Sequence, residues 1–166
     1  GSQALFLLAV LLPLVALSQA QDRPVLRAGV LPEGFQLTGT LNDSAWRDAD
    51  AIENLTTIEP IEGGVPTGRT IVKVLANREN IVIGIVCEDP DPGGIVSFSK
   101  ARDSYFRGED SIRIVFDTFM DGRSGYIFAV NPEGARFDAL VSGTERDNSN
   151  WDTIWEAKTS RDSMGW

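Results

Sequence analysis

The chain has 166 residues, a formal net charge of -9, one cysteine and no histidine. This acidic balance leaves no basic patch that could neutralise phosphates, which excludes nucleic acid as an expected partner. The lone Cys87 allows no internal disulfide, and without histidine neither a Cys/His metal cluster nor a His-ligated haem can form. The hydrophobic core alone must therefore stabilise the fold, with Cys87 inside it as a small apolar residue.

Residues 1–20 are predicted to be a secretory signal peptide that begins with a two-residue cloning remnant. An almost unbroken apolar run covers 4–17, and small residues follow at Ser18 and Ala20, as at a signal peptidase site. The alternative is a buried or anchoring apolar helix, but the run contains Pro13 and is short for a bilayer span. A signal peptide implies export to the periplasm, the outer membrane or the cell exterior.

The remainder of the chain is the size of one ordinary domain. We expect an extended lead-in over 21–33, followed by the domain itself over 34–166. Short segments bounded by turn residues predict strands over 35–39 and 53–59 near the start of this domain.

A short helix is expected around Trp46. Asn42 or Asp43 is a good N-cap, and Ala45, Trp46 and Ala49 share one face at helical spacing. A lone tryptophan on so short a helix usually fills the edge of a core. We therefore expect Trp46 to be structural rather than in contact with a ligand.

Two stretches, 70–76 and 80–88, predict a β-hairpin joined by a turn at 77–80. The second stretch is apolar on both faces, which is typical of a strand in the middle of a packed sheet. The mixed stretch 95–111 follows neither the helical nor the strand period. We expect it to be a long loop with a helical turn.

Three further strands are predicted to form a meander over 111–141. Apolar side chains alternate along 111–118, 125–130 and 135–141, which indicates half-buried antiparallel strands. Between the second and third strands, Asn131-Pro132-Glu133-Gly134 has the residues of a tight turn.

A last strand is expected over 151–156. The chain stops at Trp166 where another strand would follow, so we expect the domain to be incomplete. Many short strands, regularly spaced turns and very little helix predict an all-β fold, either an antiparallel β-sandwich or a jelly roll.

Several motifs follow one another in a characteristic order: GTLNDSAW at 39–46, IVIGI at 81–85, EDPD at 88–91, EDSIRIVFD at 109–117, GYIFAVNP at 125–132 and WDTIWE at 151–156. This order resembles the family 9 carbohydrate-binding modules, which are related to the DOMON superfamily. It is most similar to the version at the N-terminus of exported bacterial proteins whose C-terminal region resembles an outer-membrane β-barrel. The resemblance covers nearly all of 34–166 and implies a β-sandwich that binds glycans without catalysis.

Sugar-binding family 9 modules clamp a sugar between two tryptophans, with polar side chains beneath. Aromatic rings suit sugars because the axial C–H faces are apolar while the hydroxyl rim forms hydrogen bonds. No tryptophan lies between Trp46 and Trp151. The first aromatic wall of such a clamp would therefore have to be Phe98, Tyr105 or Phe106. The resemblance therefore gives a candidate carbohydrate site made of Tyr105, Phe106, Arg107 and Trp151.

This clamp has a geometric condition. Tyr105 precedes the three-strand meander and Trp151 follows it, and an odd number of strands places these two loops at opposite ends of the sheet. Both loops can contribute only if 95–109 folds along the sheet face. Trp155 begins the expected last strand and is assigned to the core.

Carboxylates offer a second candidate site. Asp89, Asp91, Asp103 and Asp110 could gather at one end of a sandwich, where oxygen-rich loops suit Ca²⁺. Calcium also occurs in the sugar-binding modules that the sequence resembles. The alternative is that these are solvated carboxylates of an acidic protein, since their spacing is not that of an EF-hand.

Asp117 and Asp121 could be the acid and base of a glycosidase. However, Asp121-Gly122-Arg123 is typical of a turn, and Asp117 ends a strand. No nucleophile–base constellation accompanies them, so no catalysis is expected from this part of the protein.

Three classes of function remain. The first is a glycan-binding module of a larger exported protein linked to polysaccharide breakdown. The second is an interaction or plug-like domain that packs on an outer-membrane β-barrel, such as the C-terminal region of the same protein, without binding sugar. The third, a DOMON-type redox domain, is disfavoured because only Met120 and Met164 could ligate haem. An exposed aromatic pair at one end of the sandwich distinguishes the first class from the second.

Overall fold

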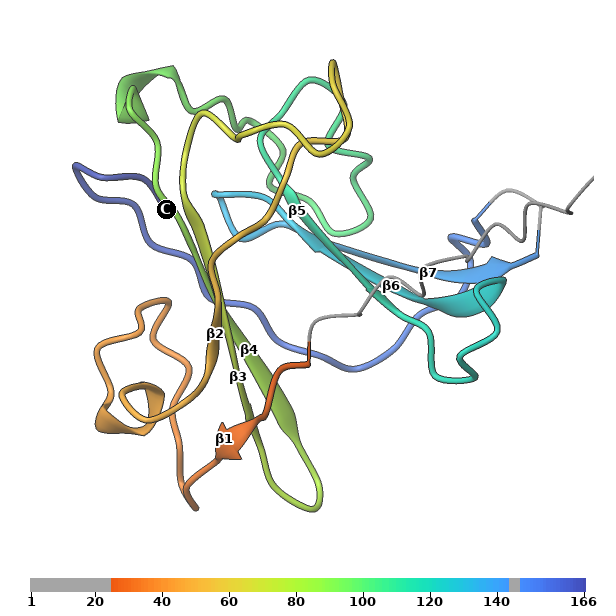
Figure 1. The fold of residues 1–166 in the computed structure, drawn as a ribbon. Coiled ribbons are helices and arrows are strands. Elements are labelled where there is room, and N and C mark those ends of the chain that lie inside the picture. Colours follow the sequence, from red (N-terminus) through yellow and green to blue (C-terminus); the bar gives the residue numbers. More distant parts are fainter. Residues whose placement is uncertain (1–24, 144–146) are drawn as a thin grey trace, which may run out of the picture.

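The computed structural model describes residues 25–143 and 147–166. It consists mostly of strands in two sheets with almost no helix, which confirms the all-β fold (Figure 1). The predicted signal peptide, 1–20, lies outside the described residues. Within the described ranges, no helix has the length and apolar character needed to cross a membrane.

The first sheet is organised around the predicted hairpin of β3 (Thr70–Ala76) and β4 (Ile81–Cys87). These strands pair antiparallel along their whole length. Two short strands, β1 (Gly29–Val30) and β2 (Ala51–Ile52), lie on the other edge of β3, the first parallel and the second antiparallel to it. Among these strands β4 pairs with β3 alone, so β3 lies between β4 and the two short strands. Within the described residues, the other edge of β4, predicted to be a central strand, is paired only at its end, where Cys87 and Trp166 exchange backbone hydrogen bonds of 2.8 Å and 3.0 Å.

The strands predicted over 35–39 and 53–59 are not formed. The first of these segments has turn geometry on either side, because Gly34 and Gly39 have φ angles of +73° and +82°. The pairing with β3 is made instead by β1, within the expected lead-in, and by β2.

The short helix is confirmed as one 3₁₀ turn, η1 (Ser44–Trp46). Asp43 is its N-cap, and the Asp43 Oδ1 atom accepts a hydrogen bond of 2.8 Å from the backbone N–H of Ala45. A second 3₁₀ turn, η2 (Pro92–Gly94), opens the long loop that leads to the second sheet.

The first core cluster packs the N-terminal segment against the β3–β4 hairpin. Its buried members are Trp46, Leu31, Ala49 and Leu75, with Phe35 packed against them. Trp46 is only 4% exposed, which confirms its predicted place in the core. Its ring lies over Gly84 of β4, where a Cβ atom would come within 2.9 Å of the indole.

The second sheet is the predicted meander of β5 (Ile112–Phe116), β6 (Ser124–Val130) and β7 (Arg136–Ser142). The predicted turn closes β6 and β7, with the N–H of Gly134 donating to the carbonyl of Asn131 at 2.9 Å. One face of this sheet carries a buried cluster of Ile127, Ala129, Phe137 and Ala139. The opposite face is aromatic and includes Phe116, Tyr126 and Phe128.

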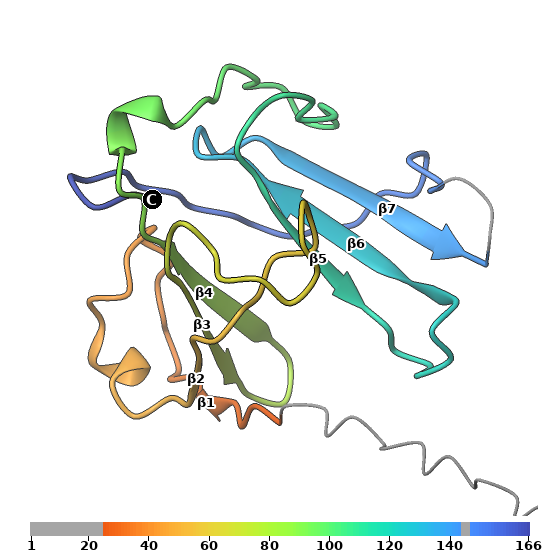
Figure 2. The ribbon, with the colours of Figure 1, turned by 45° about the horizontal axis from the view of Figure 1, so that its top comes forward.

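The segment 151–161 lies extended against the aromatic face but forms no strand, contrary to the prediction. Its exposure alternates, and the rings of Trp151 and Trp155 lie 6.2 Å and 5.2 Å from that of Phe128. The chain then crosses to the first sheet, where Gly165 forms a β-bridge with Glu88 beside β4 (Figure 2). Contacts from side chains therefore hold this segment where a strand was expected.

Candidate functional site

The loop 95–110 folds along the face of the second sheet that carries the buried cluster. Phe106 packs on this cluster, and the ring of Tyr105 lies on Phe137 with 5.3 Å between centroids. The backbone N–H of Asp103 donates to the carbonyl of Arg136 at 2.8 Å, which docks the loop on the outer edge of β7. A clamp made by both loops requires that 95–109 folds along the sheet face, and this loop does so.

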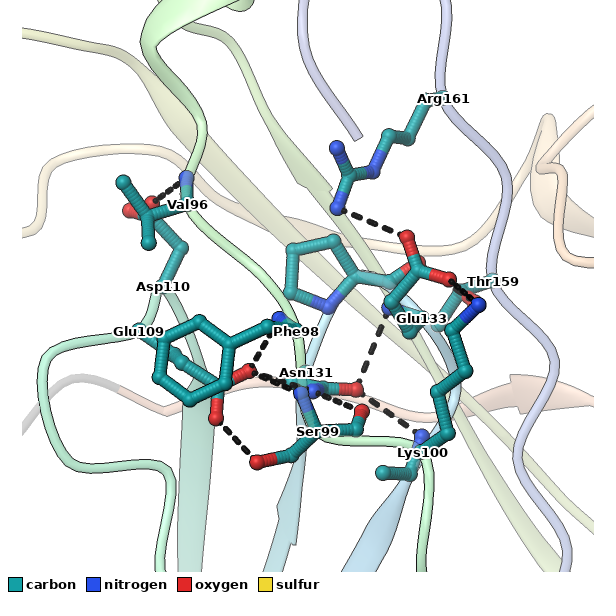
Figure 3. A network of polar contacts seen from close by, with 12 residues as sticks. Val96, Phe98, Ser99, Lys100, Glu109, Asp110, Asn131, Glu133, Thr159 and Arg161 are labelled. Carbon is teal, nitrogen blue, oxygen red and sulfur yellow. Dashed lines mark hydrogen bonds and ion pairs between the residues drawn. The ribbon is translucent and has the colours of Figure 1, made fainter.

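Glu109 fixes one end of the loop (Figure 3). Its carboxylate accepts hydrogen bonds from the backbone N–H of Phe98 at 2.8 Å, from that of Ser99 at 2.9 Å and from the Ser99 hydroxyl. Asn131, which has no exposed surface, adds a fourth bond of 3.0 Å from its Nδ2 atom. Desolvation favours the neutral acid, but the bonds from Ser99, Phe98 and Asn131 outweigh it and lower the pKa of Glu109 to about 2.

The Asn131 amide joins this loop to the β6–β7 turn. Its Nδ2 atom also donates to the carbonyl of Ser99 at 2.8 Å, while its Oδ1 atom accepts from the backbone N–H of Ala135 at 2.9 Å. Outside this buried amide, Glu133 forms ion pairs with Lys100 at 3.8 Å and Arg161 at 3.3 Å (Figure 3). Loop, turn and C-terminal segment therefore meet at this end of the sheet.

A second cluster of polar contacts lies at the edge of β7, around Asp138. The buried carboxylate of Asp138 accepts hydrogen bonds from Arg102 Nη2 and the Thr153 N–H, both at 2.8 Å, and from Trp155 Nε1 at 3.2 Å. Arg102 also donates to the carbonyl of Thr153 at 3.1 Å and pairs with Asp152. These contacts around Asp138 hold both the loop 95–110 and the segment 151–155 against strand β7.

The predicted carbohydrate residues are divided between the two faces of the second sheet. Tyr105 is 65% exposed, and its hydroxyl lies 3.0 Å from Ser149 Oγ. Phe106 is half-buried on the core cluster, and Arg107 is exposed beside it. Trp151 packs on the aromatic face, with its ring 5.0 Å from that of Tyr126.

The Tyr105–Trp151 clamp is therefore not formed. The chain crosses the edge of β7 between these rings, since Asn148 forms a β-bridge with Leu140. Ser149 thus reaches the side of Tyr105, whereas Trp151, two residues later, lies on the opposite face. Trp155, which was assigned to the core, is half-buried against Phe128.

The four aspartates predicted to hold calcium are not brought together. Asp89 accepts a bond from the backbone N–H of Asp91, Asp110 accepts one from that of Val96, and Asp103 lies 3.8 Å from Arg102. In the part of the chain that the structure describes, no group of three or more Asp, Glu, Cys or His side chains could hold a metal ion. Asp89 and Asp91 share one turn, whereas Asp103 and Asp110 belong to the loop 95–110, and the contacts named here join these carboxylates to backbone N–H groups or to Arg102.

Other singled-out residues also have local roles. Asp121 accepts hydrogen bonds from the backbone N–H groups of Ser124 and Arg123, which lower its pKa and close the β5–β6 turn. Asp117 accepts bonds from the N–H groups of Asp121 and Gly122 in the same turn. Cys87 is a free, half-buried thiol whose pKa is raised by burial.

Sequence reasoning missed the four polar residues that organise the site: Arg102, Glu109, Asn131 and Asp138. Alternation along β7 predicts that Asp138 faces solvent, because it is out of phase with Phe137 and Ala139. The segment 151–155 covers it instead. Asn131 carried only its turn signal, which says nothing about a partner in a distant loop.

The two organising carboxylates and the Tyr105 ring differ in how far the protein itself engages them. The carboxylates of Glu109 and Asp138 are each engaged by three or more donors from the protein itself. Tyr105, by contrast, offers an exposed ring in a fixed position. Comparisons of the chain with protein-family models, curated proteins and solved structures gave no match.

Proposed function

We propose that this chain is a non-catalytic carbohydrate-binding module of a larger exported bacterial protein. The observation that carries the proposal is the state of Tyr105, which is 65% exposed although Phe137 and Ser149 fix its ring and its hydroxyl. An exposed but immobilised ring is a preorganised platform, because little side-chain freedom is lost when the C–H face of a sugar packs on it. Arg107, two residues later, can donate hydrogen bonds to sugar hydroxyls.

The fold that we propose with this function is an antiparallel β-sandwich of the DOMON-like type. The aromatic face of β5–β7 and the half-buried apolar residues of β4 support this arrangement, because both are suited to an interior between two sheets. The resemblance to family 9 modules supports export and a link to polysaccharide breakdown. The absence of catalysis is supported by the engaged carboxylates of Glu109 and Asp138.

The test is calorimetric titration with soluble cello-, xylo- and other oligosaccharides. If Tyr105 is the platform, Tyr105→Ala should weaken binding about tenfold or more, while Tyr105→Phe retains most of it. Phe119→Ala is the matched control, since Phe119 is an exposed aromatic residue in the distant β5–β6 turn. No heat with any sugar at millimolar concentration in the folded parent protein would reject carbohydrate binding.

A second candidate is an interaction or plug-like domain that packs on an outer-membrane β-barrel, including the C-terminal region of its own protein. Exposed apolar side chains on β5 and its following turn favour it, namely Val115, Phe119 and Met120. The test is co-purification with the barrel region in detergent. Phe119→Ser with Met120→Ser should abolish it, and Tyr105→Ala should not.

A further inference from the structure

A cavity of about 550 Å³ lies in the N-terminal segment that packs on the first sheet. It is formed by the segment 32–44, before and within the start of η1, and shares no residue with the loop that carries Tyr105. Its volume lies within the range of about 300–1,000 Å³ that is usual for small-ligand sites. The residues that line it include Phe35, Gln36, Thr38, Thr40, Asn42 and Ser44.

The walls of this cavity are held by contacts to the rest of the protein. Phe35 meets the buried Trp46 ring edge-on, with 5.8 Å between centroids, so its own ring is fixed. At the other end, the hydroxyl of Ser160 donates to the carbonyl of Gly39 at 2.6 Å. The hydroxyls of Thr38 and Thr40 lie 3.1 Å apart and orient each other. The segment is thus preorganised although it forms no strand.

The lining has the chemistry that recognises a polyhydroxylated ligand. One aromatic ring is combined with several neutral hydroxyl and amide side chains, which both donate and accept hydrogen bonds. The Gln36 Nε2 atom donates to the carbonyl of Gly34 at 3.2 Å, which leaves its Oε1 atom as an acceptor. Sugars need this combination of an apolar face and a ring of alternating donors and acceptors.

The charges at the cavity indicate which sugars fit. Glu33 and Asp43 are the acidic residues of the lining, and no lysine or arginine is part of it. An acidic lining without a cation disfavours uronates and sulfated sugars, because like charges repel. We propose that this cavity is a second carbohydrate site, selective for neutral saccharides. It stands on different residues from the Tyr105 platform and does not depend on it.

The test is a titration of the ¹⁵N-labelled protein, followed by amide chemical shifts, with cellohexaose, xylohexaose and hexagalacturonate as probes. A neutral hexasaccharide should shift amides within 33–44 in a saturable manner, and the same shifts should persist in Tyr105→Ala. The double variant Gln36→Ala, Asn42→Ala should weaken this binding about fivefold or more. Lys158→Ala is the matched control, since Lys158 is exposed and lines no part of the cavity.

The outcomes separate this site from the first. Shifts within 33–44 that survive Tyr105→Ala and weaken in the double variant support the second site, even if the Tyr105 platform binds nothing. Absence of shifts within 33–44 with both neutral sugars at millimolar concentration overturns it, even if Tyr105 binds. Tighter binding of hexagalacturonate than of the neutral sugars overturns the selectivity. If the melting curve of the double variant matches that of the parent, any loss of binding is due to the missing contacts with the sugar and not to unfolding.

Discussion

The Nη2 atom of Arg102 lies 2.8 Å from Oδ1 of Asp138, a carboxylate whose side chain has no exposed surface. Thr153 and Trp155 donate to the same carboxylate, so one buried charge joins the loop 95–110, strand β7 and the segment 151–155. A buried charge is tolerated only where partners replace the water it has lost. Arg102 is therefore expected to determine how firmly these three parts stay together.

Arg102→Ala should lower the free energy of unfolding substantially, because it leaves the Asp138 carboxylate buried without its cation. Loss of one partner of a buried pair costs about 3–5 kcal/mol, and the partial exposure of Arg102 places the expected value near the lower figure. Urea denaturation measures it. Arg161→Ala is the control, since its pair with Glu133 is more exposed on both sides and should contribute less than about 1 kcal/mol. Equal losses in the two variants would contradict the role assigned to Arg102.

Glu109 should make stability depend on pH. Its pKa in the folded protein is about 2, below the ordinary value of 4.5, so folding favours the ionised form. Its contribution is complete above pH 4.5 and is lost as the pH falls from there towards about 2. Glu109→Gln should therefore be less stable than the parent at neutral pH, with a difference that shrinks through this window. Denaturation curves across the range test this, with Glu62→Gln in an exposed loop as control; a constant difference would count against it.

Much of the fold follows from local sequence. The hairpin of β3 and β4, the β5–β7 meander and the Asn131–Gly134 turn are fixed by neighbouring residues, and period-two patterning finds them. The segment 151–156 shows the limit of the same signal. Its alternation of exposure arises because it lies flat on a sheet, which produces the pattern of a strand without a strand's hydrogen bonds.

The candidate site was only partly predictable for a related reason. Its organising contacts join residues far apart in sequence: 36 positions separate Arg102 from Asp138, and 22 separate Glu109 from Asn131. No local period records such pairs. Similarly, the crossing of the β7 edge between Ser149 and Trp151 decides which face the tryptophan occupies, and neither residue type signals that crossing.

In the first sheet, the burial of a side chain should determine how much unfolding free energy is lost when it is truncated to alanine. Leu75 in β3 has no exposed surface, whereas Ile81 at the start of β4 is 55% exposed. Leu75→Ala should therefore cost about 2–5 kcal/mol of unfolding free energy, and Ile81→Ala less than about 1.5 kcal/mol. Ile83, which is half-buried, should fall between them. Chemical denaturation of the three variants tests the order, and a larger loss for Ile81→Ala would contradict β3 as the centre of this sheet.

Gly39 should be the position where a substitution disturbs the packing of the C-terminal segment against the N-terminal segment 32–44. Its φ angle is +82°, and a Cβ atom there would lie 2.9 Å from the carbonyl carbon and oxygen of Thr159. Gly34 provides the matched control, because its φ angle is +73° but nothing lies within 4 Å of a Cβ placed on it. Both alanine variants must adopt left-handed backbone, at about 1–2 kcal/mol each.

Only Gly39→Ala must in addition displace Thr159 and lengthen the bond from Ser160 to the Gly39 carbonyl. Its loss of unfolding free energy should therefore exceed that of Gly34→Ala by about 1 kcal/mol or more. Because Thr159 and Trp155 share one extended segment, displacement should also alter the fluorescence of Trp155 on Phe128. Equal losses with unchanged fluorescence would mean that 159–160 does not press on Gly39 in solution.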